Sequence, residues 1–372
     1  MTSADVIIVG AGMAGASIGA ELADLGADVL LIEMEDQPGY HATGRSVAFW
    51  EESYGGPEVQ PLTTASGPLL ARPGDAMGGR SFLSPRGAVH VGREESRGRR
   101  DALLTAFSGQ VVLDSMDVAE MRARIPGLRQ DWTVGLAEPS CADIDAAALH
   151  QAYLTRLRRR GARIETDLRL TAARRDGQGW RIETQRGDML SCAMLVNAAG
   201  AWADIVARAS GVGPVGITPF RRTVVQLRTD PRPPVDLPLV MDLEEGFYFK
   251  PVGDGRIWLT PHDETPSDPC DAAPEELSIA QAIDRFEQVV DWRVEAVERR
   301  WAGLRSFAPD RLPVYGFDPL ARGFFWFAGQ GGFGIQTAPA AGLLGAALLT
   351  GGAADAAIGA VDPAPFDPGR FE

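Results

Sequence analysis

Three glycines near the start of the chain have the spacing that binds a nucleotide phosphate. They belong to the run Gly10-Ala11-Gly12-Met13-Ala14-Gly15, directly after the β-branched residues Val6–Val9. In such a turn the first glycine allows the bend, the second lets a pyrophosphate approach the backbone, and the third lets helix and strand pack closely. Free amides at the start of the following helix attract the phosphate. The pattern therefore predicts a dinucleotide-binding turn.

An acidic residue stands where a ribose acceptor is expected. Residues 16–25 favour a helix that ends at Gly26, residues 29–32 read as a second strand, and Glu33 follows that strand. A carboxylate there accepts hydrogen bonds from a ribose and disfavours a 2′-phosphate, so NADP is the poorest fit.

Ser17 matches the Gly-x-Ser-x-Gly motif of hydrolases, but it falls inside the helix rather than on a sharp turn. This position argues against a serine nucleophile.

Three further segments favour FAD over NAD. Residues 37–46 form a polar, glycine-punctuated stretch that could run beside a pyrophosphate towards a flavin ring. Residues 195–202 are a strand that leaves through small residues into a helix, and the apolar strand 324–328 runs into the glycine-rich loop 329–337. This last loop presents amides and a helix N-terminus, which favour negative charge on the pyrimidine edge of a reduced flavin.

Length and composition narrow the class of protein. The 372 residues are enough for two or three domains, and 45% hydrophobic and 23% charged residues are close to the globular average. The net charge of −14 repels nucleic acid. Lys250 is the only lysine, which argues against pyridoxal enzymes and P-loop kinases. Neither the three cysteines nor the four histidines have metal-ligand spacing, so no metal site is predicted.

Together these segments resemble the D-amino-acid-oxidase-type family of FAD-dependent amine oxidoreductases. The likeness covers nearly the whole chain and is closest to the bacterial D-arginine dehydrogenases, over residues 38–54, 142–150, 301–307 and 331–337. It implies an α/β fold of the D-amino acid oxidase and glycine oxidase type. A discontinuous Rossmann-like FAD-binding domain would comprise residues 1–61, 143–213 and 321–372. An α+β substrate-binding domain with a mostly antiparallel sheet would comprise residues 62–142 and 214–320.

The resemblance implies a non-covalent FAD, with covalent attachment through His41 as the alternative. The cofactor-binding residues that it implies are Gly10, Gly12, Ala14, Gly15, Glu33, Met34, Ala42, Thr43, Gly44, Arg45, Ser46, Arg169, Ala199, Gly200, Trp202, Gly331, Gly332, Gly334, Ile335, Gln336 and Thr337.

The same resemblance assigns the substrate residues. Arg222, Tyr248 and Arg305 align with the catalytic residues that hold a substrate carboxylate, for which a guanidinium offers paired donors, although Arg221 is a rival for Arg222. Gly332 would offer a carbonyl to the substrate amine. The substrate-binding residues implied are Tyr54, Phe49, Glu51, Ala88, Gly332 and Gln336.

Three positions depart from the arginine-preferring relatives. Ala88 replaces a glutamate that anchors a cationic side chain, Phe49 replaces a histidine, and Glu51 replaces a small hydroxyl residue. Glu51 could supply a substitute carboxylate, but the favoured interpretation is that Glu51 and Glu52 form a solvated acidic pair. Without a buried partner a basic side chain loses about 1.5–3 kcal/mol of charged hydrogen bonding. A neutral or apolar substrate side chain is therefore expected.

The expected activity is oxidative deamination of a D-amino acid to the 2-oxo acid and ammonia, with hydride transfer from Cα to flavin N5, by a dehydrogenase. The alternatives are a secondary-amine oxidase acting on sarcosine-like or proline-like substrates, and a flavin-binding subunit without turnover of its own.

The expected partners are a small amino acid as substrate and an electron acceptor, which could be a quinone, a carrier or oxygen. With no visible signal peptide and no apolar run near the roughly 18 residues of a membrane span, a cytoplasmic protein is expected, at most peripheral to the inner membrane.

Overall fold

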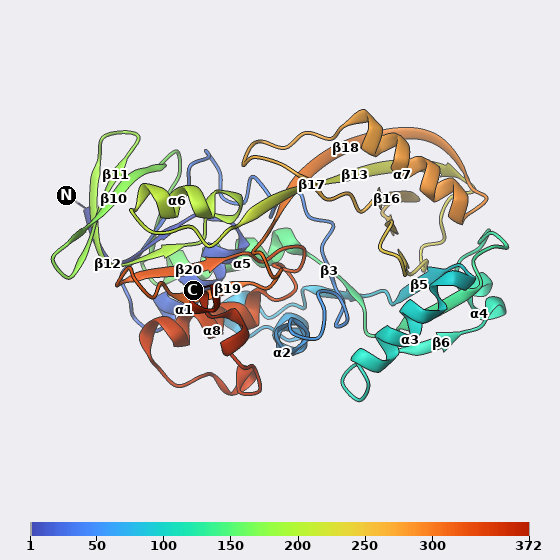
Figure 1. The fold of residues 1–372 in the computed structure, drawn as a ribbon, viewed down its shortest axis with the longest axis horizontal. Coiled ribbons are helices and arrows are strands. Elements are labelled where there is room, and N and C mark those ends of the chain that lie inside the picture. Colours follow the sequence, from blue (N-terminus) through green and yellow to red (C-terminus); the bar gives the residue numbers. More distant parts are fainter. Residues whose placement is uncertain (1, 372) are drawn as a thin grey trace.

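The computed structural model describes residues 2–371, which form two parts that lie side by side (Figure 1). One part is built on an eight-stranded sheet and the other on a nine-stranded sheet. A small third sheet consists of β3 (Phe49–Trp50), β8 (Ala142–Ile144) and β4 (Leu83–Pro85). Both β3 and β4 pair antiparallel with β8.

The first sheet is mostly parallel where the predicted phosphate loop leaves it. Its order is β10 (Leu170–Asp176), β11 (Gly179–Thr184), β12 (Met189–Asn197), β1 (Thr2–Val9), β2 (Val29–Ile32) and β9 (Arg163–Glu165). The end of β12 also pairs in parallel with β20 (Phe324–Ala328), and β20 pairs antiparallel with β19 (Val314–Phe317). Because both faces of β1 and β2 are covered, their core residues are continuously apolar.

Helices cover both faces of this sheet. The helices α1 (Met13–Asp24), α5 (Ala146–Arg159) and α8 (Ala338–Thr350) share one apolar core with Ile8 and Leu31, whereas α6 (Ala203–Ala209) shares another with Ile7 and Leu30. Alternate strand residues thus point to opposite helix layers, as the pleat requires. The predicted strand-helix-strand unit at the N-terminus is confirmed.

The second sheet is mostly antiparallel, as expected. Its order is β17 (Thr265–Pro266), β13 (Thr218–Asp230), β16 (Arg256–Thr260), β15 (Tyr248–Val252), β14 (Leu239–Asp242), β5 (Ala88–Gly92), β7 (Val134–Glu138) and β6 (Asp114–Met116). Only β14 and β5 pair in parallel. The other helices are α2 (Gln60–Ala71), which packs on α8, and α3 (Arg97–Ala106), α4 (Val118–Arg124) and α7 (Glu276–Val289) beside this sheet. Short 3₁₀ helices span Asp75–Met77, Glu94–Ser96, Gly200–Trp202, Ala356–Ile358, Ala364–Phe366 and Pro368–Phe371.

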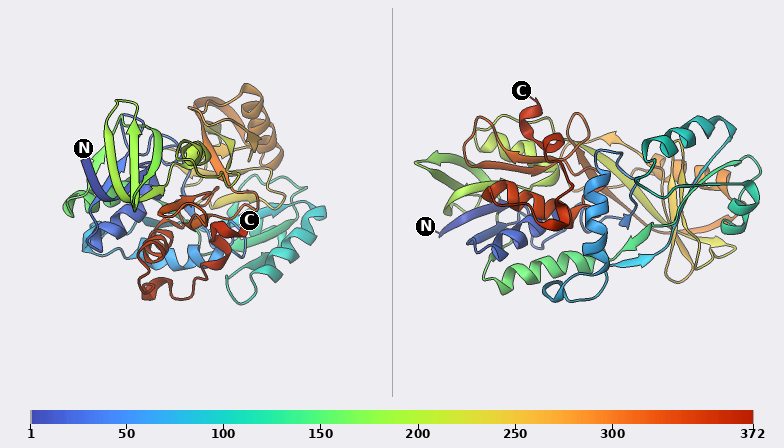
Figure 2. Two further views of the ribbon diagram at one scale, coloured as in Figure 1. Left: turned by 60° about the vertical axis from the view of Figure 1, so that its left-hand side comes forward. Right: turned by 90° about the horizontal axis from the view of Figure 1, so that it is seen from below.

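A long two-stranded ribbon extends from the second part towards the first. It consists of β13 and β18 (Arg293–Phe307), which arch across the top of Figure 1 and are seen from two other directions in Figure 2. Arg222 lies opposite Gly303, and Arg305 lies two residues further along β18. Because side chains alternate along a strand and directly opposed residues share a face, Arg222 and Arg305 lie on the same face of the ribbon.

The expected domain boundaries remain a prediction. We expected Val314–Phe317 to belong to the substrate-binding domain. These residues form β19, which pairs with β20, so by strand pairing they belong to the first part. Among residues 2–371, no helix is both long and apolar enough to cross a membrane.

The single lysine ties the small sheet to the second part. The Lys250 Nζ donates to the carbonyls of Val47 (2.8 Å) and Ala48 (3.2 Å) and to Oδ1 of Asp143 (2.7 Å). Burial lowers the pKa of Lys250, although the Asp143 carboxylate opposes this shift. Lys250 therefore has a structural role.

We predict that Lys250→Met lowers the free energy of unfolding by about 3 kcal/mol, because it leaves two carbonyls of the chain interior and one oxygen of the half-buried Asp143 carboxylate without this donor. Chemical denaturation of the flavin-loaded protein measures this loss. The matched control is Arg97→Gln, which breaks the exposed pair with Glu94 and should leave the midpoint nearly unchanged. Equal losses in the two variants would contradict the assignment.

Candidate cofactor and substrate site

The phosphate loop needs glycine at two positions for steric reasons. Gly10 has φ +103°, and a Cβ there would lie 2.5 Å from the Ala198 carbonyl oxygen. A Cβ on Gly15 would lie 1.9 Å from the carbonyl oxygen of Gly10. At Gly12 a Cβ would meet only the Thr43 hydroxyl oxygen, at 3.2 Å, so this side of the loop is open.

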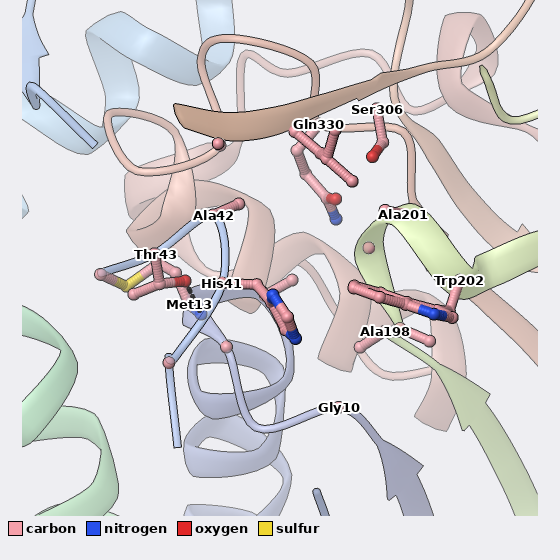
Figure 3. A pocket seen from close by; sticks show the side chains of 18 of the residues that line it. Gly10, Met13, His41, Ala42, Thr43, Ala198, Ala201, Trp202, Ser306 and Gln330 are labelled. Atoms are coloured by element: carbon pink, nitrogen blue, oxygen red, sulfur yellow. Dashed lines mark hydrogen bonds between the residues drawn. The ribbon is translucent and has the colours of Figure 1, made fainter. Parts of the chain in front are cut away.

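The amides at the start of α1 are available to an anion. Gly12 caps the helix without a side-chain acceptor, and Met13 N–H donates to the Thr43 hydroxyl (2.9 Å). The next amides of the first turn have no acceptor within the helix. They face a cleft beside the loop, together with the positive end of the helix dipole. Figure 3 shows the loop at Gly10 below the side chains of this cleft.

Glu33 lies at the end of β2 and lines the same cleft. Its carboxylate accepts from the amides of Ala11 (2.8 Å) and Glu35 (3.1 Å). Burial raises the pKa of Glu33, although these amide hydrogen bonds oppose the shift. The remaining lone pairs are free for a ribose, so the predicted role stands as a proposal.

One continuous cleft connects the phosphate loop with the β13–β18 ribbon. Its empty volume, open mouth included, is about 1630 Å³. Most of the predicted cofactor residues line it: Gly10, Gly12, Ala14, Glu33, Met34, Ala42, Thr43, Arg45, Ser46, Arg169, Ala199, Gly200, Trp202, Gly331, Gly332, Gly334 and Ile335. Four do not, namely Gly15, Gly44, Gln336 and Thr337. The last two are buried beneath the loop surface.

Two rings meet inside this cleft. The centroids of His41 and Trp202 are 4.6 Å apart (Figure 3), and His41 Nε2 lies 2.7 Å from Glu35 Oε1. These side chains come from segments that are far apart in the sequence, so the contact was not predicted. Gln330 and Ser306 also line the cleft but were not among the predicted site residues. Each is the sequence neighbour of a predicted residue, Gly331 and Arg305 respectively.

Arg305 is held by two tyrosine hydroxyls at the ribbon end of the cleft. Its Nη1 donates to the Tyr54 hydroxyl (2.6 Å) and its Nη2 to the Tyr248 hydroxyl (3.2 Å). Arg305 and Tyr248 line the cleft, whereas Tyr54 lies behind Arg305. The arrangement fixes a guanidinium group in place and leaves it without a carboxylate partner within salt-bridge distance in the described chain.

Arg222 lies beside it with one donor unused. Its Nε donates to the Asp263 carbonyl (2.8 Å) and its Nη2 to Glu264 Oε1 (3.1 Å), while Nη1 is buried without a hydrogen-bond partner. Burial and the neighbouring Arg305 lower the pKa of Arg222 to about 10, which leaves it charged at neutral pH. The rival Arg221 pairs instead with Glu275 at 2.6 Å and does not line the cleft.

His262 is a neighbour of this pair that the sequence did not indicate. Its ring lies edge-on to Tyr248, with centroids 5.7 Å apart, and its Nδ1 lies 2.6 Å from the Glu245 carbonyl oxygen. Burial and the charges of Arg222 and Arg305 lower the pKa of His262 to about 2, so its imidazole is neutral. The sequence gives no sign of this contact, because nothing in the spacing of His262 connects it with either arginine.

The other predicted substrate residues form a wall behind the cleft. Phe49 packs edge-on against Tyr54 and Tyr248, with ring centroids 5.2 and 5.5 Å apart. Ala88 belongs to the same buried cluster as Phe49 and Tyr248. Gln336 donates to the Tyr54 carbonyl (3.0 Å) and accepts from the Glu51 amide (3.2 Å). Phe49, Ala88 and Gln336 do not line the cleft itself, whereas the predicted substrate residue Gly332 does.

The interpretation of Glu51 and Glu52 as a solvated pair is wrong for Glu51. Its exposed fraction is 0%, and its Oε1 lies 2.8 Å from His90 Nε2. The segment that carries it is covered by β5 and β7, which supply His90 and Glu138. Glu51 also lies outside the cleft, so it is no substitute anchor at the cleft surface. Burial and the Glu51 charge raise the pKa of Glu138 to about 7.

Comparisons with known proteins place this geometry in a family. The model of the DAO family, described as FAD dependent oxidoreductase, matches residues 5–348. A glycine oxidase of Pseudomonas aeruginosa is 26% identical over 382 residues, covering 98% of each chain. FAD-dependent oxidoreductase domain-containing protein 1 of Bos taurus is 31% identical over 181 residues, which are 43% of this chain and 36% of that protein. The crystal structure of glycine oxidase from Geobacillus kaustophilus superposes with a TM-score of 0.85 at 24% identity, covering 99% of this chain and 98% of that one.

The chain therefore belongs to the DAO family of FAD-dependent oxidoreductases, and its cofactor is FAD. The residues present fit that group, because the open side of Gly12, the free amides of α1 and the carboxylate of Glu33 occur in the order that a dinucleotide requires. The finer likeness to D-arginine dehydrogenases stays a prediction.

We predict that Gly10→Ala lowers FAD affinity about tenfold or more, because the new Cβ would push the loop from the Ala198 carbonyl and strain a left-handed backbone. The control is Gly26→Ala, which has φ +90° but nothing within 4 Å of the added Cβ. The ratio of flavin to protein absorbance after dialysis measures the effect. Equal flavin loss in both variants would mean that general strain, not the loop contact, is responsible.

Proposed function

We propose that this protein catalyses FAD-dependent oxidative deamination of D-amino acids with neutral or apolar side chains, yielding the 2-oxo acid and ammonia. The observation that carries the proposal is the pair Arg222 and Arg305, which lies at one end of the cofactor cleft with a guanidinium donor left free. A paired guanidinium site is the usual protein group for a carboxylate. The names of the glycine oxidase relatives support an amino acid substrate.

The chain's own residues bind and orient the substrate. Arg222 Nη1 and the Arg305 guanidinium would receive the α-carboxylate, with the Tyr248 hydroxyl beside them. A Cβ on Gly332 would lie 2.7 Å from the Tyr54 hydroxyl and 2.9 Å from Arg305 Nη1, so only glycine leaves room at this position. Its carbonyl would accept a hydrogen bond from the substrate amine.

The bound FAD supplies a hydride acceptor for the substrate carbon. We assign no side chain as the base, because the amine can lose its proton to solvent. The imino acid released then takes up water to give the 2-oxo acid and ammonia. The contribution of the protein is therefore to hold carboxylate and amine so that the reacting carbon faces the flavin.

The wall behind the cleft supports a neutral or apolar side chain. Phe49 and Ala88 of this wall pack in one apolar cluster with Tyr248, which lines the cleft in front of them. The buried carboxylates Glu51 and Glu138 lie behind this wall and do not line the cleft, so a substrate side chain in the cleft does not reach them. A cationic side chain would thus lose its hydration without gaining a free partner.

The second candidate is a secondary-amine oxidase or dehydrogenase. The structure of L-proline dehydrogenase from P. horikoshii has the same fold, with a TM-score of 0.85 at 19% identity and coverage of 100% of this chain and 98% of that one. Ammonia release distinguishes the two, because ring and N-methyl substrates release none. Adding amino acids without air should bleach the flavin of either enzyme, whereas a flavin-binding subunit without turnover would keep its colour. A panel of D- and L-isomers in the same measurement tests the stereochemistry.

We predict that Arg305→Ala raises the substrate concentration for half-maximal flavin reduction by about a hundredfold, since a charged hydrogen-bond partner of the carboxylate is lost. Flavin content should stay at the wild-type level. The matched control is Arg221→Ala, which removes the neighbouring arginine that pairs with Glu275 away from the cleft. Similar concentrations for both variants would exclude Arg305 as the carboxylate ligand.

We predict that anaerobic flavin reduction at low substrate speeds up with rising pH, because only the deprotonated amine can release a hydride from its carbon. Arg222, whose pKa is about 10, and His262, whose pKa is about 2, keep their charge states between pH 6 and pH 9. The apparent pKa should therefore follow the substrate amine when substrates of different amine pKa are compared in stopped-flow measurements. A flat profile would refute this description.

A further inference from the structure

A second group of chemically reactive side chains lies outside the cleft. Glu51, His90 and Glu138 form a buried cluster, here called the Glu51 cluster, in which one ligand atom of each residue lies within 4.8 Å of the others. The three residues come from the turn after β3, from β5 and from β7. The proposed reaction makes no use of them.

The Glu51 cluster holds two buried carboxyl groups but one basic side chain. The exposed fractions of Glu51, His90 and Glu138 are 0%, 7% and 0%. Within residues 2–371, neither carboxylate forms an ion pair with an arginine or lysine, and His90 is the single basic group in contact with Glu51. Glu51 Oε2 is fully buried and has no hydrogen-bond partner. Because an unpaired buried carboxylate is costly, the cluster calls for a further cation.

The carboxylates are oriented from behind by donors of the chain. Glu138 accepts from the Ser53 hydroxyl (2.5 Å) and from the Glu52 amide (2.6 Å). The backbone of Glu51 is held by Gln336, which accepts from its amide at 3.2 Å. Such outer hydrogen bonds are typical around ligating carboxylates, because they fix the orientation of the ligand.

We propose that the Glu51 cluster binds one divalent first-row transition-metal ion, with Zn²⁺ as the reference ion. His90 would supply a ring nitrogen, Glu138 one oxygen and Glu51 both oxygens, which makes a four-ligand N/O set of the kind that Zn²⁺ accepts. Small side-chain rotations bring atoms within 4.8 Å to the ion's ligand distances of about 2.0–2.2 Å. Two carboxylates and a neutral imidazole then balance the charge of the ion.

The ion would have a structural role beside the substrate wall. Glu51 lies two residues after Phe49 and three before Tyr54, so a metal bond from Glu51 to β5 and β7 would hold Phe49 against Tyr54 and Tyr248. It would connect the segment behind the cleft to the second sheet at a single point. This proposal does not depend on the identity of the substrate.

The first experiment measures metal in the flavin-loaded protein. After incubation with Zn²⁺ and removal of excess ion by gel filtration, elemental analysis should find about one zinc per chain, and treatment with a chelator should lower the melting temperature by about 3 °C or more. Titration calorimetry of the chelated protein with Zn²⁺ should show one site. Zinc at background level together with an unchanged melting temperature would overturn the proposal, and would mean that protons alone balance the cluster.

Variants locate the site. Glu51→Gln and His90→Gln should each lose the bound zinc and the thermal shift, because each removes a ligand while keeping a similar shape. The matched control is Glu52→Gln, whose carboxylate accepts from the Thr64 hydroxyl (2.6 Å) rather than facing the cluster, and it should keep the zinc. Retention of zinc in both ligand variants would overturn the assignment. If a ligand variant does not fold, the wild-type titration still decides.

Discussion

Two guanidinium groups held close together inside the protein are the constraint on which the rest of this site depends. Arg222 and Arg305 repel each other, and burial removes the water that would screen them. The chain supplies partial compensation through Glu264, the Asp263 carbonyl and two tyrosine hydroxyls. The donor that remains at Arg222 Nη1 is the one that we propose for the substrate carboxylate.

The ribbon of β13 and β18 makes this arrangement possible. Its register places both arginines on one face, and its ends bring that face over the loop that follows β20. In the first part, α1 points its N-terminal amides into the same cleft. In the function that we propose, the cofactor phosphate and the substrate carboxylate would thus bind at two separate positive sites in one cleft.

Local chemistry explains what could be predicted from the sequence. The turn at Gly10–Gly15, the strands on either side of α1 and the family to which they belong depend on neighbouring residues, and these predictions are confirmed. The choice between Arg221 and Arg222 depends on strand register, which needs the partner strand. The burial of Glu51 depends on His90 and Glu138, which follow it by about 40 and 90 positions, so no window around residue 51 could reveal it.

Residues behind the cleft connect the glycine-rich loop at the cofactor with the arginine at the proposed substrate end. Gln336, from the glycine-rich loop after β20, holds both Glu51 and the carbonyl of Tyr54. Tyr54 in turn holds Arg305, so the loop at the cofactor and the arginine at the substrate end are joined through two hydrogen bonds. A shift of the loop on cofactor binding would therefore move the hydroxyl that orients Arg305. The proposed carboxylate site and the loop at the cofactor are thus linked through Tyr54.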